Sequence, residues 1–229
     1  MLFLAARLKG AMARTVGFGY DFVPRAMTRK HVGISAETRA LMLSGAMYDD
    51  LTSELIEARA GAVRLSNAFN ATWGQPQEVR DEALRRLVRS VGPGSMFEPV
   101  LRVEFGENIT IGRNFFANFD CVILDGAEVT IGDFVLFGPR VGIYTSNHAI
   151  DPGERAAGGC FAKPIIIGNR CWIGGGVHIM GGVTIGEGTI VGAGSVVTKS
   201  LPAKVIAGGV PARVIRSITE EDRTGFKTA

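Results

Sequence analysis

The chain has 229 residues, of which 46% are hydrophobic and 21% charged, and its formal net charge at neutral pH is +3. This small charge argues against nucleic acid as a partner, and no apolar run reaches the eighteen or so residues of a membrane-spanning helix. Three cysteines without a CxxC spacing favour a reducing compartment, and hence the cytoplasm, over a disulfide framework.

Residues 1–34 form a basic extension in which Asp21 is the single acidic residue. Arg7 and Lys9 interrupt its first apolar stretch, so we do not interpret it as a signal peptide. A disordered arm, a surface-binding helix and sequence upstream of a start at Met27 all remain open for this segment.

Residues 35–92 are predicted to be helical. Ser35 offers a side-chain cap to a first helix, and apolar residues recur at helical spacing with charges between them over 51–70. A third helical segment, QEVRDEALRRLVRSV, ends before Gly92-Pro93-Gly94, which closes the helical part.

Residues 93–217 follow a period of six. Every sixth residue from Ile167 to Val197 is aliphatic, and glycine follows four of these six positions, where we expect it to supply the turn backbone. One repeat is long enough only for a short extended side and a sharp turn, so three repeats make a triangular coil of about eighteen residues that stacks on the next. The predicted fold is therefore mainly β, a parallel β-helix, with a cap over 202–216 and a charged tail at 218–229.

The period breaks between Ile143 and Ile167. The intervening residues, near 145–164, are polar and rich in Gly and Pro, so they are predicted to project as a loop, where binding or catalysis is often carried. His148 lies at the root of this loop. By itself it is equally consistent with a loop histidine whose hydrogen bonds are satisfied. His178 falls in a strictly phased coil and is better explained as a packed or coil-face histidine.

These motifs resemble a known family. The hexapeptide run, the YTSNHAIDPGER loop, the KPIIIGNRCWIGGGVHI stretch and the ending VIAGGVPARVIR are similar to the hexapeptide-repeat acyltransferases. The preamble TRALMLSGAMYDDLTSELIEARAGAVRLSNAFNAT and the motif NFFANFDCVILD narrow the resemblance to maltose and galactoside O-acetyltransferases, and nodulation-type sugar acetyltransferases are similar too. The resemblance implies a left-handed β-helix, a homotrimer with active sites between subunits, and metal-free transfer of acetyl from acetyl-CoA to a saccharide hydroxyl.

The resemblance also implies roles for single residues. His148 matches the catalytic histidine, a general base that takes the acceptor's proton as its hydroxyl attacks the thioester. The positions that match acceptor contacts are Asp50, Arg59, Glu104, Phe116, Asn118 and Asp125. The positions that match the coenzyme A groove are Trp172, Gly175, Ala193, Thr198, Lys199, Arg213 and Arg216.

Three acceptor positions depart from the galactoside enzymes. Phe116 stands where that type has a tyrosine, Gly126 stands where it has a second acid after Asp125, and Glu104 is a different residue type. These departures argue against lactose-type glycosides as the acceptor. They leave open a non-sugar acceptor, such as an antibiotic or an amino acid, and a non-enzymatic trimeric scaffold is the further alternative.

A local surplus of positive charge fits a phosphate-bearing donor. Between Cys160 and Arg216 six basic residues face one acid, Glu187, although solvated surface charge explains this equally well. A zinc carbonic anhydrase on the same scaffold is rejected, because it needs three histidines and only His148 and His178 lie in the coils.

Overall fold

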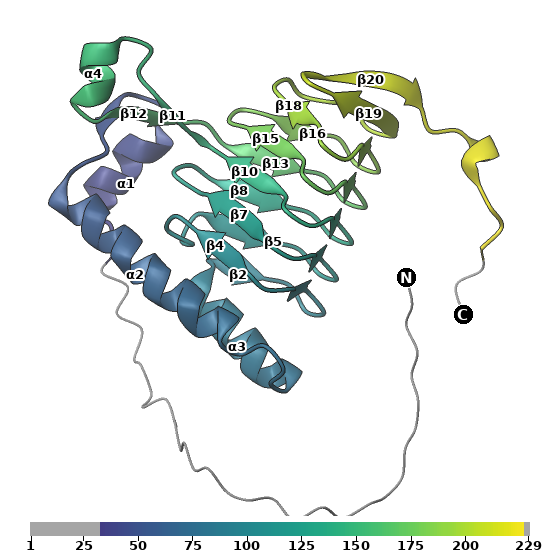
Figure 1. Ribbon diagram of the computed structural model, residues 1–229, viewed down its shortest axis with the longest axis horizontal. Helices are drawn as coiled ribbons and strands as arrows, with labels where there is room; N and C mark the ends of the chain where they lie inside the picture. Colours follow the sequence, from purple (N-terminus) through teal and green to yellow (C-terminus); the bar gives the residue numbers. More distant parts are fainter. Residues whose placement is uncertain (1–32, 227–229) are drawn as a thin grey trace, which may run out of the picture. The chain divides into compact units, whose positions relative to one another are not determined.

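The computed structural model describes residues 33–226, drawn in colour in Figure 1. Most of the basic extension predicted over 1–34 lies outside the described residues. None of the helices within 33–226 is long and apolar enough to cross a membrane.

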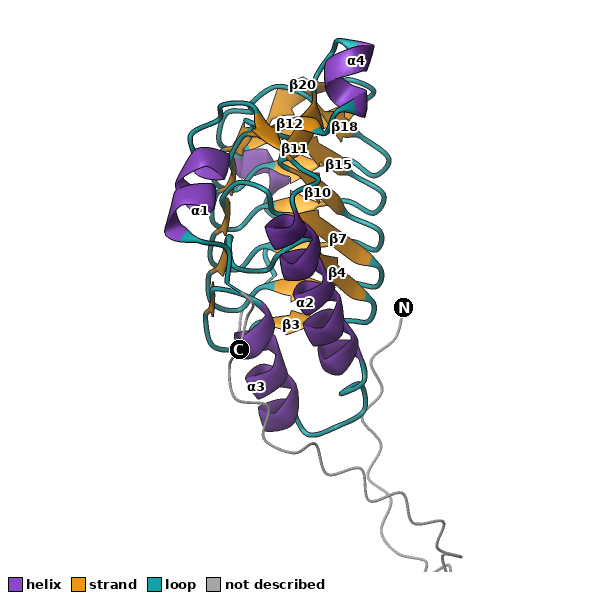
Figure 2. Ribbon diagram, turned by 90° about the vertical axis from the view of Figure 1, so that its left-hand side faces the viewer, coloured by secondary structure: helices purple, strands orange, loops and turns teal. Residues whose placement is uncertain are grey.

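Three helices precede the coils in the described part of the chain (Figure 2): α1 (Ala36–Leu43), α2 (Ser53–Asn70) and α3 (Gln77–Leu87). The predicted cap of the first helix is confirmed, since the Ser35 hydroxyl accepts a hydrogen bond from the Thr38 backbone N–H at 3.2 Å. The third helix is shorter than the predicted segment, because Val88 is already extended and Ser90 pairs with Thr110 of the next coil.

Short strands then wind into stacked coils of three. The first coil holds β2 (Ser90–Val91), β3 (Met96–Phe97) and β4 (Leu101–Val103), and the second holds β5 (Ile109–Ile111), β6 (Phe116–Ala117) and β7 (Cys121–Leu124). The third holds β8 (Val129–Ile131), β9 (Leu136–Phe137) and β10 (Gly142–Tyr144), and the fourth holds β13 (Ile165–Ile167), β14 (Trp172–Ile173) and β15 (His178–Met180). The fifth holds β16 (Thr184–Ile185), β17 (Ile190–Val191) and β18 (Val196–Val197).

Each strand of a coil pairs in parallel with its counterpart in the next coil, which confirms the predicted parallel β-helix. Three sheets result, and we name each after its first strand: the β2 sheet, the β3 sheet and the β4 sheet. In the β3 sheet, β19 (Val205–Gly209) follows β17 and then pairs antiparallel with β20 (Ala212–Ser217). This hairpin covers the β17 side of the last coil.

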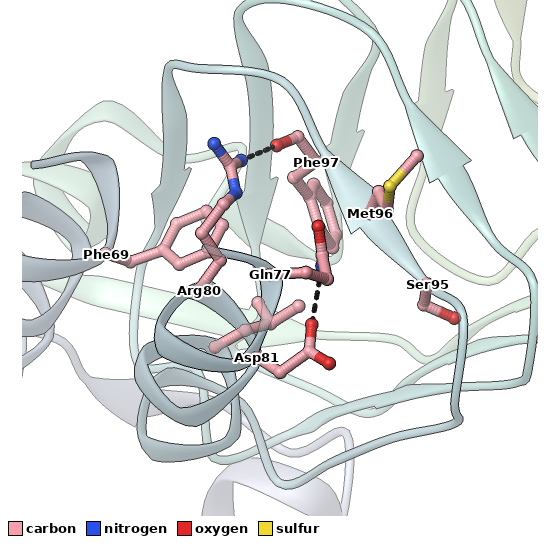
Figure 3. A pocket seen from close by; sticks show the side chains of 8 residues that line it. Phe69, Gln77, Arg80, Asp81, Ser95, Met96 and Phe97 are labelled. Atoms are coloured by element: carbon pink, nitrogen blue, oxygen red, sulfur yellow. Dashed lines mark hydrogen bonds between the residues drawn. The ribbon is translucent and has the colours of Figure 1, made fainter. Parts of the chain in front are cut away.

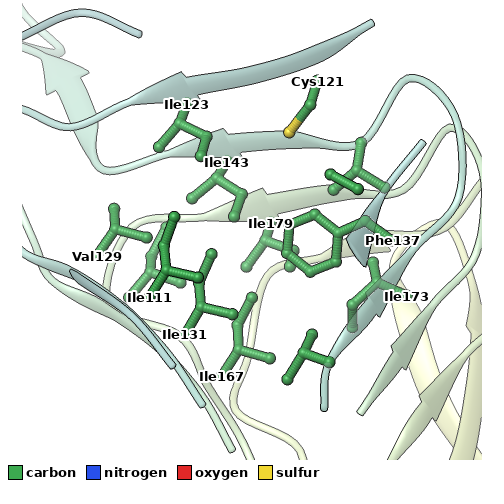
Figure 4. Packing of buried hydrophobic residues seen from close by; sticks show 14 of the residues in the cluster. Ile111, Cys121, Ile123, Val129, Ile131, Phe137, Ile143, Ile167, Ile173 and Ile179 are labelled. Carbon is green, nitrogen blue, oxygen red and sulfur yellow. The ribbon is translucent and has the colours of Figure 1, made fainter. Parts of the chain in front are cut away.

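The inward residues of the three sheets form one continuous core (Figure 4). Ile111, Ile131 and Ile167 stack in the β2 sheet, and Ile123, Ile143 and Ile179 stack in the β4 sheet, all at most 3% exposed. The six-residue period therefore corresponds to the side chain of each short strand that faces inward.

The glycines after the inward aliphatics are required for a different reason from the expected one, which was turn geometry. A Cβ at Gly168 would lie 2.6 Å from the backbone nitrogen of Glu187 in the next coil, and Gly174 and Gly186 are equally crowded by backbone. The left-handed backbone conformation occurs two residues later, at Arg170, Gly176 and Gly188. Close stacking of the coils, and not turn geometry, requires the first glycine.

In the first coils, one corner of the triangle is longer than the other two. The inward residues on either side of the connection from the β4 sheet to the β2 sheet are eight apart at Ile123 and Ile131, and the loop after Ile143 is inserted at this same corner. We call this edge the long corner. It brings Glu104, Asp125 and the residues after Tyr144 to one side of the coils.

Candidate active site

The projecting loop is an ordered hairpin. β11 (Ser146–His148) and β12 (Gly159–Ala162) pair antiparallel, and α4 (Pro152–Ala156) lies between them in the chain (Figure 1). The Asp151 carboxylate caps α4 by accepting hydrogen bonds from the backbone of Gly153 and Glu154 at 2.8 and 2.9 Å. On its other side β12 pairs with β1 (Tyr48–Asp49), which ties the helical segment to the loop.

His148 belongs to a row of side chains across this small sheet. Cys160 in the central strand lies directly opposite both His148 and Tyr48, and directly opposed residues project from the same face of a sheet. The Cys160 thiol donates to the Tyr48 hydroxyl at 3.5 Å. Asp50, the residue after β1, donates its backbone N–H to the Gly158 carbonyl at 2.9 Å. Ligand atoms of Asp50, His148 and Cys160 consequently lie within 4.8 Å of one another.

Arg59 joins this row to the coils. Its guanidinium forms a close ion pair with the Asp50 carboxylate and donates to the Asp50 carbonyl at 2.9 Å. It also pairs with the Glu104 carboxylate at 3.0 Å, and the Ser146 hydroxyl donates to the second Glu104 oxygen at 3.3 Å. The structure thus brings together three of the predicted acceptor residues, Asp50, Arg59 and Glu104, beside His148.

The electrostatics of this group follow from its burial. Burial raises the pKa of Glu104, although the charge of Arg59 opposes the shift. Burial alone would lower the pKa of Arg59, but the Glu104 and Asp50 carboxylates outweigh it and raise the pKa. One fixed cation therefore faces two carboxylates, and the exposed His148 ring lies beside them.

Asp125 lies beneath the group. Its side chain is 0% exposed, and its carboxylate accepts hydrogen bonds from the backbone N–H groups of Phe105 at 2.9 Å and Asn108 at 3.1 Å. Burial raises the pKa of this carboxyl. The side chain braces the turn of the long corner that carries Glu104. At the neighbouring Gly126 a Cβ would lie 2.3 Å from the Ser146 hydroxyl. An acidic side chain at this position would therefore require Ser146 to move.

Phe116 and Asn118 lie elsewhere in the same chain. They belong to β6 and its end in the β3 sheet, and both side chains are half-buried. The Asn118 side-chain oxygen accepts from the backbone N–H of Phe119 at 2.8 Å. In this chain no contact joins these two described residues to the His148 row.

The predicted donor positions are spread over the last coils. Gly175 and Ala193 occupy the same corner of successive coils, where the Gly194 backbone N–H donates to the Gly175 carbonyl at 2.9 Å. Trp172 is 54% exposed on the β3 sheet. The remaining positions are exposed, after β18 and on β20: Thr198, Lys199, Arg213 and Arg216.

Two of the basic residues predicted to contact coenzyme A differ in their ion pairs. Arg216 forms a two-pronged ion pair with Asp222 at 2.7 and 2.8 Å, which lowers the pKa of that carboxyl to about 2. Lys199 makes no ion pair within residues 33–226, so its charge is available to a ligand.

Three residues beside His148 were not predicted from the sequence: Tyr48, Ser146 and Cys160. Cys160 is buried and lies opposite His148. No local signal identifies it, because the register of a hairpin with a long connection is not determined by spacing.

A separate recess lies between α3 and β3 (Figure 3). It is shallow and open to solvent, and its polar groups pair internally: Gln77 donates to Asp81 at 2.6 Å and Arg80 donates to the Phe97 carbonyl at 2.5 Å. It contains none of the predicted site residues.

Both the helical segment and the coils match known protein families. Residues 41–92 match the maltose acetyltransferase hexapeptide capping motif, and residues 164–199 match the bacterial transferase hexapeptide with six repeats. Nodulation protein L of Rhizobium meliloti is 44% identical over 76% of this chain and 94% of its own. Galactoside O-acetyltransferase of Escherichia coli is 41% identical over 79% of this chain and 89% of its own. A solved galactoside acetyltransferase in complex with coenzyme A has a TM-score of 0.77 at 40% identity, covering 82% of this chain and 94% of that chain.

Proposed function

The chain belongs to the hexapeptide-repeat acetyltransferases of the maltose and galactoside O-acetyltransferase family, and from this premise we propose that His148 is its general base. The protein transfers the acetyl group of acetyl-CoA to a saccharide hydroxyl. The observation that carries the proposal for His148 is its position: an exposed imidazole at the root of the loop, beside the Asp50–Arg59–Glu104 group.

The proposed reaction is a direct transfer. The neutral His148 imidazole takes the hydroxyl proton while the acceptor oxygen attacks the thioester carbonyl carbon. The carbon–sulfur bond then breaks, and the departing thiolate takes the proton back from the imidazolium. No covalent acyl-enzyme forms, so the base needs only to lie between the acceptor and the donor.

The acceptor contacts are proposed as a fixed polar wall. Asp50 and Glu104 accept hydrogen bonds from sugar hydroxyls, and Arg59 holds both carboxylates in place. Asp125 acts through the turn that carries Glu104. Preorganised partners of this kind lower the cost of orienting the attacking hydroxyl.

A homotrimer with sites between subunits is part of the proposal. Three outward residues in register along the β3 sheet, Met96, Leu136 and Trp172, are 43%, 49% and 54% exposed. The β2 sheet presents Thr110, Thr130 and Thr184 at its outward positions, with the apolar Ile166 between the last two. A second copy covering the apolar β3 sheet would bring Phe116 and Asn118 of one subunit toward His148 of the next.

The donor groove is proposed at the same interface. Small residues at Gly175 and Ala193 leave room for the pantetheine arm, and Trp172 packs beside it. Thr198, Lys199, Arg213 and Arg216 supply hydrogen bonds and positive charge to the phosphates. The three free cysteines support the proposed cytoplasmic location.

The test is turnover of acetyl-CoA with a panel of sugars, glycosides, amino sugars, serine and chloramphenicol, with products identified by mass spectrometry. His148→Ala should retain its fold and coenzyme A binding while transfer falls by about a hundredfold or more, as expected for the loss of a general base. Retained turnover would exclude His148 as the base. Products from a non-sugar alone would move the acceptor to another class.

A further inference from the structure

The row beside the loop contains a set of potential metal ligands. Among residues 33–226, one group of three His, Cys, Asp or Glu side chains has its ligand atoms within 4.8 Å of one another, and it is Asp50, His148 and Cys160. A thiolate, an imidazole and a carboxylate are the ligand types that zinc takes in proteins. Magnesium and calcium prefer sets of oxygen atoms and fit this group poorly.

The backbone holds the three ligands from two sides. His148 and Cys160 are opposed residues of β11 and β12, and the Asp50 backbone N–H is bonded to the Gly158 carbonyl. Tetrahedral zinc, with Zn–S of about 2.3 Å and Zn–N of about 2.0 Å, requires ligand atoms about 3.5 Å apart. Side-chain rotations that move the ligand atoms by about 1 Å would therefore bring them to these separations. His148 is exposed, so its ring is free to make the largest movement.

The surrounding charges suit a divalent cation. Arg59 contacts one carboxylate oxygen of Asp50, and the other oxygen receives no hydrogen bond within the described residues. Glu104 shares the guanidinium, so Arg59 compensates only one of the two carboxylates. A thiolate at Cys160 would leave a local surplus of two negative charges around the ion.

We propose that Asp50, His148 and Cys160 bind a zinc ion that blocks acetyl transfer. The Cys160 thiol releases its proton to solvent as the Zn–S bond forms, and water completes the coordination. The imidazole nitrogen lone pair that would accept the acceptor's proton is then bound to the metal. The binding site stands on the geometry alone, while its inhibitory effect rests on the proposed role of His148.

Metal binding is tested without turnover. Cobalt(II) is titrated into the purified full-length protein, and the thiolate-to-cobalt charge-transfer absorption is followed. The wild type should bind one equivalent per chain with this band. Cys160→Ala should lose the band, and His148→Ala should weaken binding at least about tenfold. Cys121→Ala removes a buried thiol of the core and should bind like the wild type. Unchanged spectra in Cys160→Ala would overturn the site.

Inhibition is tested by mass spectrometry of the acetylated product, because zinc would interfere with thiol reagents. Zinc should abolish wild-type turnover, with recovery on adding EDTA. At the same concentration Cys160→Ala should keep most of its own zinc-free rate. Equal inhibition of both proteins would overturn the inhibitory role. If His148→Ala still transfers acetyl while cobalt binding depends on all three residues, the assignment of the base fails and the metal site stands.

Discussion

At the scale of single residues, the most consequential contact is the pairing of Arg59 with two carboxylates. Arg59 lies on α2, Asp50 follows β1 and Glu104 lies at the long corner, so one guanidinium links three parts of the fold. The contact both stabilises the junction and orients the proposed acceptor wall. These two effects can be separated.

Arg59→Met should leave Asp50 and Glu104 uncompensated. We expect the free energy of unfolding to fall by about 1–3 kcal/mol and the KM for the acceptor to rise. Adding Glu104→Gln should recover part of the stability, because it removes one uncompensated charge, but should not restore the KM. Urea unfolding and acceptor titrations measure the two effects. Strictly additive stability losses would show that the pair is not coupled.

A buried thiol gives the molecule a pH dependence at the alkaline end. Burial raises the pKa of Cys121 to about 12, whereas an exposed thiol titrates near about 8.5. Above the lower value the unfolded chain loses this proton and the folded chain keeps it, so stability falls as pH rises.

This loss should amount to about 1.4 kcal/mol per pH unit between about pH 8.5 and 12, and Cys121→Ala should lack it. Urea unfolding of both proteins at about pH 8 and pH 10 measures the difference. The wild type should lose about 2 kcal/mol relative to the variant between the two conditions. A constant difference would contradict the prediction.

At the scale of elements, the spacing between coils decides which glycines are required. Gly168 and Gly192 both follow an inward aliphatic, and both have backbone that a side chain can adopt. They differ in their neighbours. The next coil's backbone lies 2.6 Å from a Cβ at Gly168, while the nearest atom at Gly192 is the Ala207 carbonyl oxygen at 3.5 Å, because β19 runs on as a strand at this point instead of turning a corner.

Gly168→Ala should therefore force two coils apart and lower the free energy of unfolding by about 1–3 kcal/mol. Gly192→Ala, the matched control, should change it by less than about 0.5 kcal/mol. Thermal and urea unfolding of the two variants check the prediction. Equal losses would show that turn conformation, and not coil spacing, explains both glycines.

At the scale of the whole molecule, the proposed trimer depends on the outward side of the β3 sheet. Leu136→Asp places a charge in the middle of the exposed apolar row. We expect a folded monomer that has lost acetyl transfer, since Phe116 and Asn118 of a neighbour would no longer reach His148. Sedimentation, circular dichroism and turnover test this outcome. Ile166→Asp, on the outward side of the β2 sheet and 45% exposed, is the control and should remain a trimer.

The repeat architecture could be predicted from the sequence because its signal is local. Each inward aliphatic such as Ile173 or Ile179 is specified by a short strand and one turn, and the same rule repeats in every coil. The projecting loop that carries His148 could be predicted for the converse reason, since it interrupts the six-residue period. The three helices were also predictable from caps and periodicity, apart from the last turn of α3.

The composition of the site was decided by the tertiary structure. Arg59 and Glu104 are far apart in the chain, and Cys160 meets His148 only through the register of a hairpin that also pairs with β1. The Asp125 carboxylate is of a type that could bind the hydroxyls of an acceptor substrate. It lies beneath the turn, however, where backbone N–H groups take its hydrogen bonds. Local patterns determine which way a side chain faces in its own element, whereas contacts between distant elements depend on how those elements pack.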